Sequence, residues 1–149
     1  MRAGFTGTRN GMTVLQKDLF TRIVNCFRAM GVIAFHHGDC IGSDGEASAI
    51  VDIVMGVVGC TIVGHPPDRD SLRGYARCDE VRDKKPFIER DHDIVDETNI
   101  LIATPATLYE LQRSGTWATI RYAQRCNRPV VIIPPLDKKE VIENFHKRR

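Results

Sequence analysis

Five short apolar runs recur along the chain, and segments with helical spacing separate them. Each run is largely continuous instead of alternating with polar residues, which is typical of strands buried on both faces of a parallel sheet. Right-handed crossovers between such strands place helices on both faces. The pattern predicts an α/β fold, a Rossmann-like doubly wound parallel sheet of five strands with helices on both faces. The five runs cover residues 1–6, 32–35, 60–63, 99–103 and 129–133.

The clearest helical pattern covers residues 13–30, where apolar side chains recur with a helical period. Thr13 and Gln16 have the spacing of a capping box, which satisfies backbone N–H groups at a helix start. Gly31 follows the last apolar position and tolerates the left-handed conformation that ends many helices. We therefore expect one long helix between the first two strands.

Similar signals predict further helical segments. Ser43 and Glu46 again have capping-box spacing, and an apolar stripe follows them. Pro86 suits the first turn of another helix, with Ile94 and Val95 on its inner face. Helical segments are also expected over residues 107–110, from Ser114 to about Cys126, and around Val141, Ile142 and Phe145.

Composition narrows the class of protein. A chain of 149 residues with 42% hydrophobic content suits a single domain over residues 1–149. The net charge of +2 gives no strong field that would favour nucleic acid or a membrane as the main partner, and no apolar run approaches the roughly 20 residues that span a bilayer. The five cysteines are scattered and no secretory leader precedes them, which indicates reduced thiols in a cytoplasmic protein.

A polar segment rich in Arg and Asp covers residues 68–85 and is only weakly periodic. We expect a flexible surface loop with a solvated, charged face. The alternative is a lid in which Arg69, Arg73 or Arg77 closes over a phosphate.

Polar and glycine-rich clusters follow the predicted strands. In open parallel sheets, ligands bind beyond the carboxyl ends of the strands, near a switch in strand order. The clusters should therefore lie together at one edge of the sheet and form a binding site. They are residues 7–9, 38–44, 65–66, 104–105 and, after a short excursion, 114–116.

The stretch 113–119 has the residue types of an anion site. Ser114, Gly115 and Thr116 open a predicted helix, where free backbone N–H groups and the helix dipole favour a phosphate. The same tripeptide also makes an ordinary loop and N-cap, so the interpretation depends on the other clusters.

His36 and His37 raise the question of a metal site. Neighbours on a strand point to opposite faces, and no third ligand follows at a useful spacing, so we predict no metal and one histidine lining a pocket. The chain contains neither a G-x-G-x-x-G fingerprint nor a Walker A loop, and no cofactor is expected.

Together these clusters resemble the SLOG superfamily, the Rossmann-like group that includes the DNA-processing Smf proteins and the Lonely Guy (LOG) phosphoribohydrolases. The resemblance runs nearly end to end and implies a site for a nucleotide or a phosphoribosyl-containing small molecule, often in a homodimer. Some members of this superfamily are ligand sensors and not enzymes. The matching stretches are Gly4-Phe5-Thr6-Gly7-Thr8-Arg9, His37-Gly38-Asp39-Cys40-Ile41-Gly42-Ser43-Asp44, Pro86-Phe87-Ile88-Glu89-Arg90 and Ser114-Gly115-Thr116-Trp117-Ala118-Thr119.

LOG enzymes release the base from a nucleoside 5′-monophosphate. Glu89-Arg90 is similar to their glutamate-arginine pair, and residues 114–119 are partly similar to their Pro-Gly-Gly-x-Gly-Thr-x-x-Glu loop. Thr119 stands where that loop carries its catalytic glutamate, and a hydroxyl cannot replace a carboxylate that stabilises an oxocarbenium-like centre. LOG-type hydrolysis would therefore need another carboxylate, from Asp39, Asp44 or Glu46, together with Arg90.

Those carboxylates also have structural interpretations, because Glu46 can complete a capping box and Asp44 can favour the helix dipole. The Smf proteins bind single-stranded DNA, which requires a basic groove with stacking aromatics. This chain offers few aromatics beyond Tyr75, Trp117 and Tyr122, so nucleic acid is the third interpretation.

The leading hypothesis is a nucleotide-binding or sensor domain that forms a homodimer, with an N-glycosidase as the alternative. The candidate catalytic residues are Arg90, Asp39, Asp44 and Glu46. The candidate ligand-binding residues are Gly7, Thr8, Arg9, Gly38, Asp39, Gly42, Ser43, Asp44, His65, Arg90, Thr104, Ser114, Gly115 and Thr116.

Overall fold

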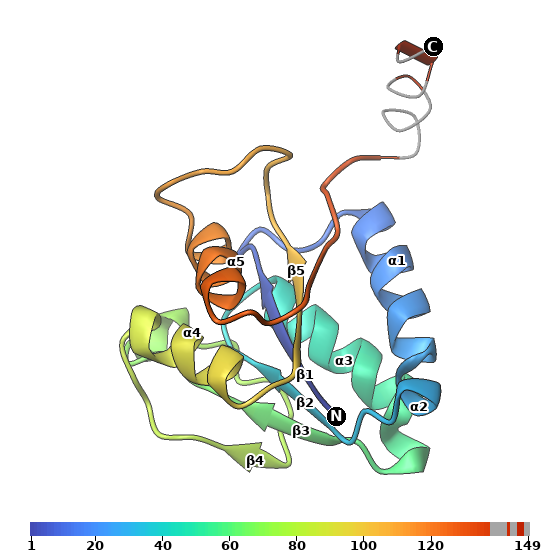
Figure 1. Ribbon diagram of the computed structural model, residues 1–149. Helices are drawn as coiled ribbons and strands as arrows, with labels where there is room; N and C mark the ends of the chain where they lie inside the picture. Colours follow the sequence, from blue (N-terminus) through green and yellow to red (C-terminus); the bar gives the residue numbers. More distant parts are fainter. Residues whose placement is uncertain (138–142, 144–145, 148–149) are drawn as a thin grey trace.

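A computed structural model, which describes residues 1–137, 143 and 146–147, contains one parallel sheet with the strand order β4-β3-β2-β1-β5-β6 (Figure 1). The chain order reverses between β1 and β5, which are neighbours in the sheet. This confirms the predicted Rossmann-like α/β fold, with six strands where five were expected. The strands are β1 (Arg2–Gly7), β2 (Ala34–His37), β3 (Thr61–Gly64), β4 (Glu80–Val81), β5 (Ile100–Thr104) and β6 (Val130–Ile132).

Helices cover both faces of the sheet. One face carries α1, α2 and α3, and the other carries α4 and α5 (Figure 1). No helix of the described residues is both long enough and apolar enough to cross a bilayer. The helices are α1 (Val14–Asn25), α2 (Phe27–Met30), α3 (Ser43–Met55), α4 (Phe87–Asp96) and α5 (Gly115–Arg125).

The capping box predicted at Thr13 is present. The Gln16 N–H donates to Thr13 Oγ1 over 3.1 Å, and the Thr13 N–H donates to Gln16 Oε1 over 3.0 Å. The expected single helix is divided at Cys26, which ends α1 and precedes α2. Gly31 ends α2 in the left-handed conformation, with φ of +73°, as predicted.

The Thr13→Ala variant should lose about 1 kcal/mol of unfolding free energy, because the cap of α1 is removed. Urea denaturation measures this loss. Thr21→Ala is the matched control, since the Thr21 hydroxyl only donates to the Lys17 carbonyl of its own helix (2.7 Å). An equal loss in both variants would contradict a capping role for Thr13.

The second expected capping box is absent. Gly42 is the N-cap of α3, and Ser43 Oγ donates to the Thr8 carbonyl (2.6 Å) instead of capping the helix. Glu46 accepts the Met12 N–H (2.7 Å) and pairs with Lys17 (2.6 Å). Tertiary partners have therefore replaced the local hydrogen bonds.

Other expectations have mixed outcomes. Residues 107–110 form no helix, and residues 106–109 are bends. Pro86 precedes α4, and Ile94 and Val95 are buried on its inner face as expected. The helix predicted around Val141, Ile142 and Phe145 lies outside the described residues.

The main core lies between the sheet and the α1–α3 layer, and it is built around four phenylalanines with no exposed surface. The Phe5 ring meets the Phe20 ring edge-on, with 5.3 Å between centroids, and Phe35 lies 6.1 Å from both. Phe27 completes the group, 6.4 Å from Phe35. This core fixes β1 and β2, whose carboxyl ends form part of the candidate site.

Candidate functional site

A cavity of about 550 Å³ lies at the carboxyl ends of β1 and β2, between α4 and the N-terminus of α5. This is the switch point between β1 and β5, where open parallel sheets bind ligands. Its volume is within the range of small-molecule sites. The predicted site residues that line it are Gly7, Thr8, Arg9, Gly38, Asp44, Arg90, Ser114, Gly115 and Thr116.

The N-terminus of α5 forms one wall of the cavity. Ser114 is the N-cap, and its Oγ accepts the Trp117 N–H over 3.3 Å. Gly115 and Thr116 occupy the first turn, where an α-helix leaves backbone N–H groups without helical acceptors. This wall therefore presents donors and the positive end of the helix dipole to a ligand.

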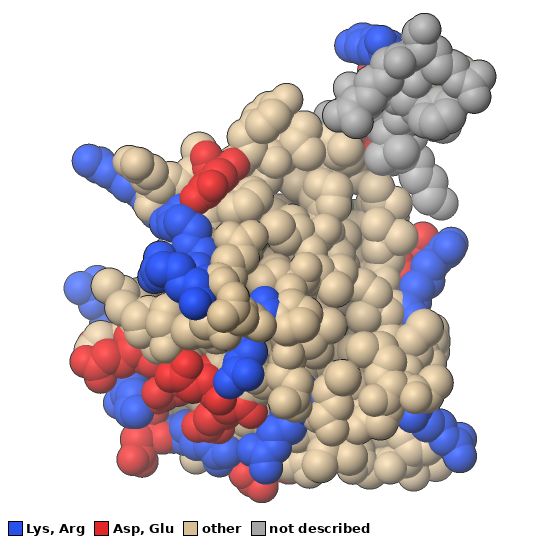
Figure 2. Space-filling view, viewed as in Figure 1, with Lys and Arg blue, Asp and Glu red and all other residues tan. Residues whose placement is uncertain are grey.

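Three arginines line the cavity: Arg9, Arg90 and Arg113. Arg9 and Arg113 are exposed, and neither forms an ion pair with another described residue. Figure 2 shows a group of Lys and Arg side chains beside α5, whereas around α4 and β4 the Lys and Arg side chains are mixed with Asp and Glu. The cavity thus has local positive charge although the chain is nearly neutral.

Arg90 is held rigidly in the wall, with 6% of its surface exposed. Its Nη1 donates to the Gly38 carbonyl over 2.9 Å and lies 3.0 Å from Cys40 Sγ. Its Nε and Nη2 both donate to Asp91 Oδ1, over 3.2 and 3.0 Å. The Phe87 ring contacts the guanidinium groups of both Arg90 and Arg9, 4.8 and 5.0 Å from its centroid. This packing holds cationic groups in fixed positions before any ligand arrives.

Two carboxylates line the same cavity. Burial raises the pKa of Asp44 to about 7, although Arg90 and the Cys40 N–H on Asp44 Oδ2 (3.0 Å) oppose the rise. Burial also raises the pKa of Asp91, again against the effect of Arg90. Near neutral pH, Asp44 can therefore either donate or accept a hydrogen bond.

The structure places the other carboxylates of the predicted site away from the cavity. Asp39, with φ of +48°, accepts hydrogen bonds from Arg73 Nε (2.7 Å) and the Ala76 N–H (2.9 Å), so it anchors the loop that follows β3. Glu46 is paired with Lys17, as described above. Asp44 is the member of the predicted set that lines the cavity.

The remaining predicted residues lie behind the cavity wall. A Cβ on Gly7 would lie 2.5 Å from Thr104 Oγ1 and 2.6 Å from Ser43 Cβ, so these side chains pack against the backbone of Gly7. Gly42 has φ of +100°, and a Cβ there would lie 2.2 Å from the Arg9 carbonyl oxygen. His65 is 1% exposed and belongs to a different polar cluster.

Two expectations based on single segments do not match the structure. His36 and His37 are both fully buried, and neither lines the cavity. In residues 68–85, for which a lid was the alternative to a surface loop, Arg73 pairs with Asp39, and Arg77 pairs with Asp52 of α3 and with Asp79 (both 3.1 Å). Their guanidinium groups are thus bound away from the cavity.

Besides Arg90, three residues of α4 line the cavity and were not among the predicted site residues: Phe87, Asp91 and Ile94. Phe87 precedes Arg90 by three residues, which places both on one helix face, so this spacing is a signal that could have identified it. The Thr119 hydroxyl donates to the Gly115 carbonyl (2.9 Å) and lies close enough to Asp91 to lower the pKa of that carboxyl group, against the larger effect of burial. A carboxylate therefore lies beside the position where LOG enzymes carry glutamate.

No protein-family model and no curated protein matches the sequence. Several solved structures do match the fold. A molybdenum cofactor binding protein from the phototrophic bacterium Rippkaea orientalis has 17% identity and a TM-score of 0.66, over 98% of this chain and 82% of its own. The molybdenum cofactor carrier protein of Chlamydomonas reinhardtii has 17% identity and a TM-score of 0.60, over 97% and 94%.

DNA processing protein A from Helicobacter pylori, described for its binding of single-stranded DNA, is similar to the same extent. It has 17% identity and a TM-score of 0.62, over 99% of this chain and 73% of its own. At such identities, likeness establishes the fold alone. The chain has the Rossmann-type fold shared by SLOG and LOG proteins, as the sequence resemblance predicted.

Proposed function

We propose that the chain is a single ligand-binding domain that holds a nucleotide or another phosphoribosyl-containing small molecule in the cavity at the β1/β5 switch point. One observation carries this proposal: Arg9, Arg90 and Arg113 line the same cavity as the first turn of α5. Guanidinium groups and helix N-termini are the two protein features best suited to a phosphate.

The lining suggests how the parts of such a ligand would be held. Its phosphate would accept hydrogen bonds from the N–H groups of Gly115 and Thr116, with Arg113 beside it. Asp44 would bind a ribose hydroxyl, because a carboxyl group with a pKa of about 7 can donate or accept at neutral pH. The Phe87 ring offers apolar surface in the same cavity.

Binding without catalysis remains the leading hypothesis, because Thr119 stands where the LOG loop carries its catalytic glutamate. A sensor domain of this kind would work in the cytoplasm, in keeping with the five free cysteines, and would form a homodimer like many proteins that the sequence resembles. The molybdenum cofactor joins the candidate ligands because two proteins of the same fold are described as binding or carrying it.

A nucleoside 5′-monophosphate N-glycosidase is the second candidate, and Asp44 favours it. Its carboxyl group lines the cavity beside Arg90, and its raised pKa suits proton transfer near neutral pH. Liquid chromatography of reactions with nucleoside monophosphates would detect the released base. Release of the base that disappears in Asp44→Asn would establish the enzyme. If no base is released, the binding domain stays the proposal.

Gly115→Asp should weaken phosphate-ligand binding at least tenfold, about 1.4 kcal/mol, because a carboxylate would occupy the anion wall. No atom lies within 4 Å of a Cβ at Gly115, and aspartate in a first helical turn favours the helix dipole, so the fold should be kept. Calorimetry with nucleoside monophosphates, ADP-ribose, cyclic nucleotides, molybdenum cofactor and short single-stranded DNA would identify the ligand class and measure the loss.

Gly115→Asn is the matched control, nearly equal in size and without charge. Equal affinity in the Asp and Asn variants would show that no anion binds at this wall. A response to DNA alone would replace the small-molecule proposal with the nucleic-acid interpretation.

A further inference from the structure

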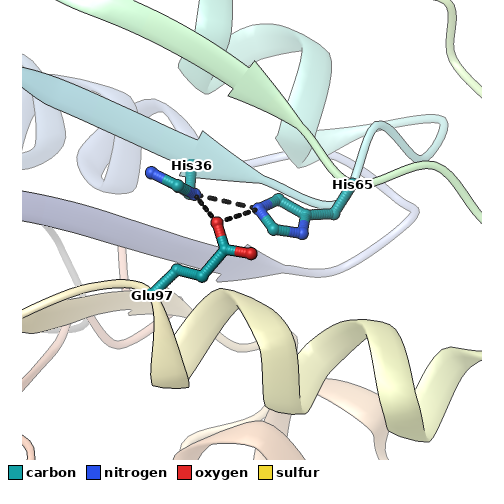
Figure 3. Close-up of side chains that lie close together, drawn as sticks. All are labelled: His36, His65 and Glu97. Carbon is teal, nitrogen blue, oxygen red and sulfur yellow. Dashed lines mark hydrogen bonds and ion pairs between the residues drawn. The ribbon is translucent and has the colours of Figure 1, made fainter. Parts of the chain in front are cut away.

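Three metal-ligating side chains meet on the α4 face of the sheet, outside the cavity described above (Figure 3). His36 comes from β2, His65 follows β3, and Glu97 is the C-cap of α4. In the sequence, His36 has no third ligand at a useful spacing, but the fold brings Glu97 to it from 61 positions further along the chain.

The three ligand atoms lie close enough together to contact one small metal ion. His36 Nδ1 lies 2.9 Å from His65 Nε2 and 3.5 Å from Glu97 Oε2, and His65 Nε2 lies 3.9 Å from the same oxygen. A triangle with these sides has a circumscribed radius of about 2.0 Å, so one point lies about 2.0 Å from all three atoms. Zinc binds imidazole nitrogen and carboxylate oxygen at about 2.0–2.2 Å.

The two imidazoles are suited to act as neutral ligands. Both are at most 1% exposed, and burial lowers the pKa of His36 to about 4 and that of His65 to about 3. At neutral pH each ring therefore has one lone pair and one N–H. His36 Nδ1 and His65 Nε2 share a hydrogen bond, so one ring must move its proton to its other nitrogen before both atoms can bind a cation. Figure 3 shows the two rings and the carboxylate converging on one another.

Arg82 lowers the affinity expected for a metal ion at this cluster. Its Nε and Nη2 donate to the same Glu97 Oε2, over 3.2 and 3.0 Å, and thus place a positive charge beside the three ligands. His36 Nε2 is buried without a hydrogen-bond partner among the described residues, and a missing outer partner typically costs 10- to 100-fold in metal affinity.

We propose that His36, His65 and Glu97 bind a divalent transition-metal ion of the zinc class, with solvent in the remaining position. Such an ion would join β2, β3 and the end of α4, so its role is to stabilise this edge of the sheet. The proposal does not depend on the cavity ligand, because none of the three residues lines the cavity.

Chelator-stripped protein titrated with ZnCl₂ should bind one equivalent of metal by calorimetry and show a rise in Tm. Glu97→Gln and His65→Gln should each weaken binding at least tenfold and abolish the rise. His92→Gln is the matched control, because His92 stacks on Tyr122 outside the cluster and its loss should change neither result. Circular dichroism of the metal-free variants verifies that they fold.

Arg82→Gln provides a readout that a purely structural cluster would not give: zinc should bind more tightly when the neighbouring positive charge is removed. Cobalt(II) absorption then reports the ligand type. Three results would each overturn the proposal: no binding of zinc, binding in Glu97→Gln or His65→Gln that is as tight as in the unaltered protein, or thiolate-to-cobalt charge-transfer bands that indicate cysteine ligands.

Discussion

Arg90→Ala should lower the free energy of unfolding by about 3 kcal/mol or more and abolish binding of the cavity ligand. The side chain is 6% exposed and makes two hydrogen bonds to Asp91 and one to the Gly38 carbonyl. Its removal leaves the Asp91 carboxylate without its cation in a buried site, and breaking a buried pair in this way costs about 3–5 kcal/mol. Urea denaturation and calorimetry with the ligand measure the two effects.

Two variants separate the loss of stability from the loss of binding. Arg90→Lys keeps the charge but lacks the planar fork, so it should remain destabilised while it recovers part of the affinity. Arg113→Ala removes an exposed arginine of the same cavity and should weaken binding with little change in stability. Unchanged affinity in Arg90→Ala would mean that the ligand binds elsewhere.

The sheet could be predicted because five of its strands are apolar runs, a pattern that depends on sequence alone. β1, β2, β3 and β5 are largely buried, whereas Val131 and Ile132 of β6 are exposed. The strand β4 could not be predicted, because it has only two residues, Glu80 and Val81, and both are exposed. Its place at the edge of the sheet depends on pairing with β3, at Val63 and Gly64. An element this short is defined by its neighbour and not by its own periodicity.

The location of the site was predictable for a topological reason: the carboxyl ends of parallel strands meet at one edge. The sequence did not indicate which of the nearby carboxylates lines the cavity. Asp39 lies in the loop after β2, and Asp44 stands five residues later, in the first turn of α3 to which this loop leads. A left-handed backbone at Asp39 turns its carboxylate toward Arg73, whereas Asp44 lines the cavity. Side-chain direction in such loops depends on tertiary partners, as does the meeting of His36 with Glu97.

Asp44 makes the stability of the protein depend on pH in a defined direction. Its carboxyl group has a pKa of about 7 in the folded protein and 3.8 as a free side chain, because burial disfavours the charged form. The folded state therefore holds this proton more tightly than the unfolded state. The resulting penalty is absent below about pH 4, grows as the pH rises toward 7, and stays constant above the folded pKa.

Asp44→Asn should remove this penalty and raise the free energy of unfolding by up to about 4 kcal/mol above pH 7, with almost no effect near pH 4. Asparagine keeps an oxygen that can accept the Cys40 N–H, so the loop should keep its hydrogen bond. Urea denaturation of both proteins between pH 4 and pH 8 measures the difference. The difference between the two proteins is the quantity to compare. Burial lowers the pKa of His36 and of His65, so these residues make the free energy of unfolding rise with pH in both proteins, opposite to the effect of Asp44. A difference that does not vary with pH would show that Asp44 is already ionised without cost, and it could then serve the cavity only as a hydrogen-bond acceptor.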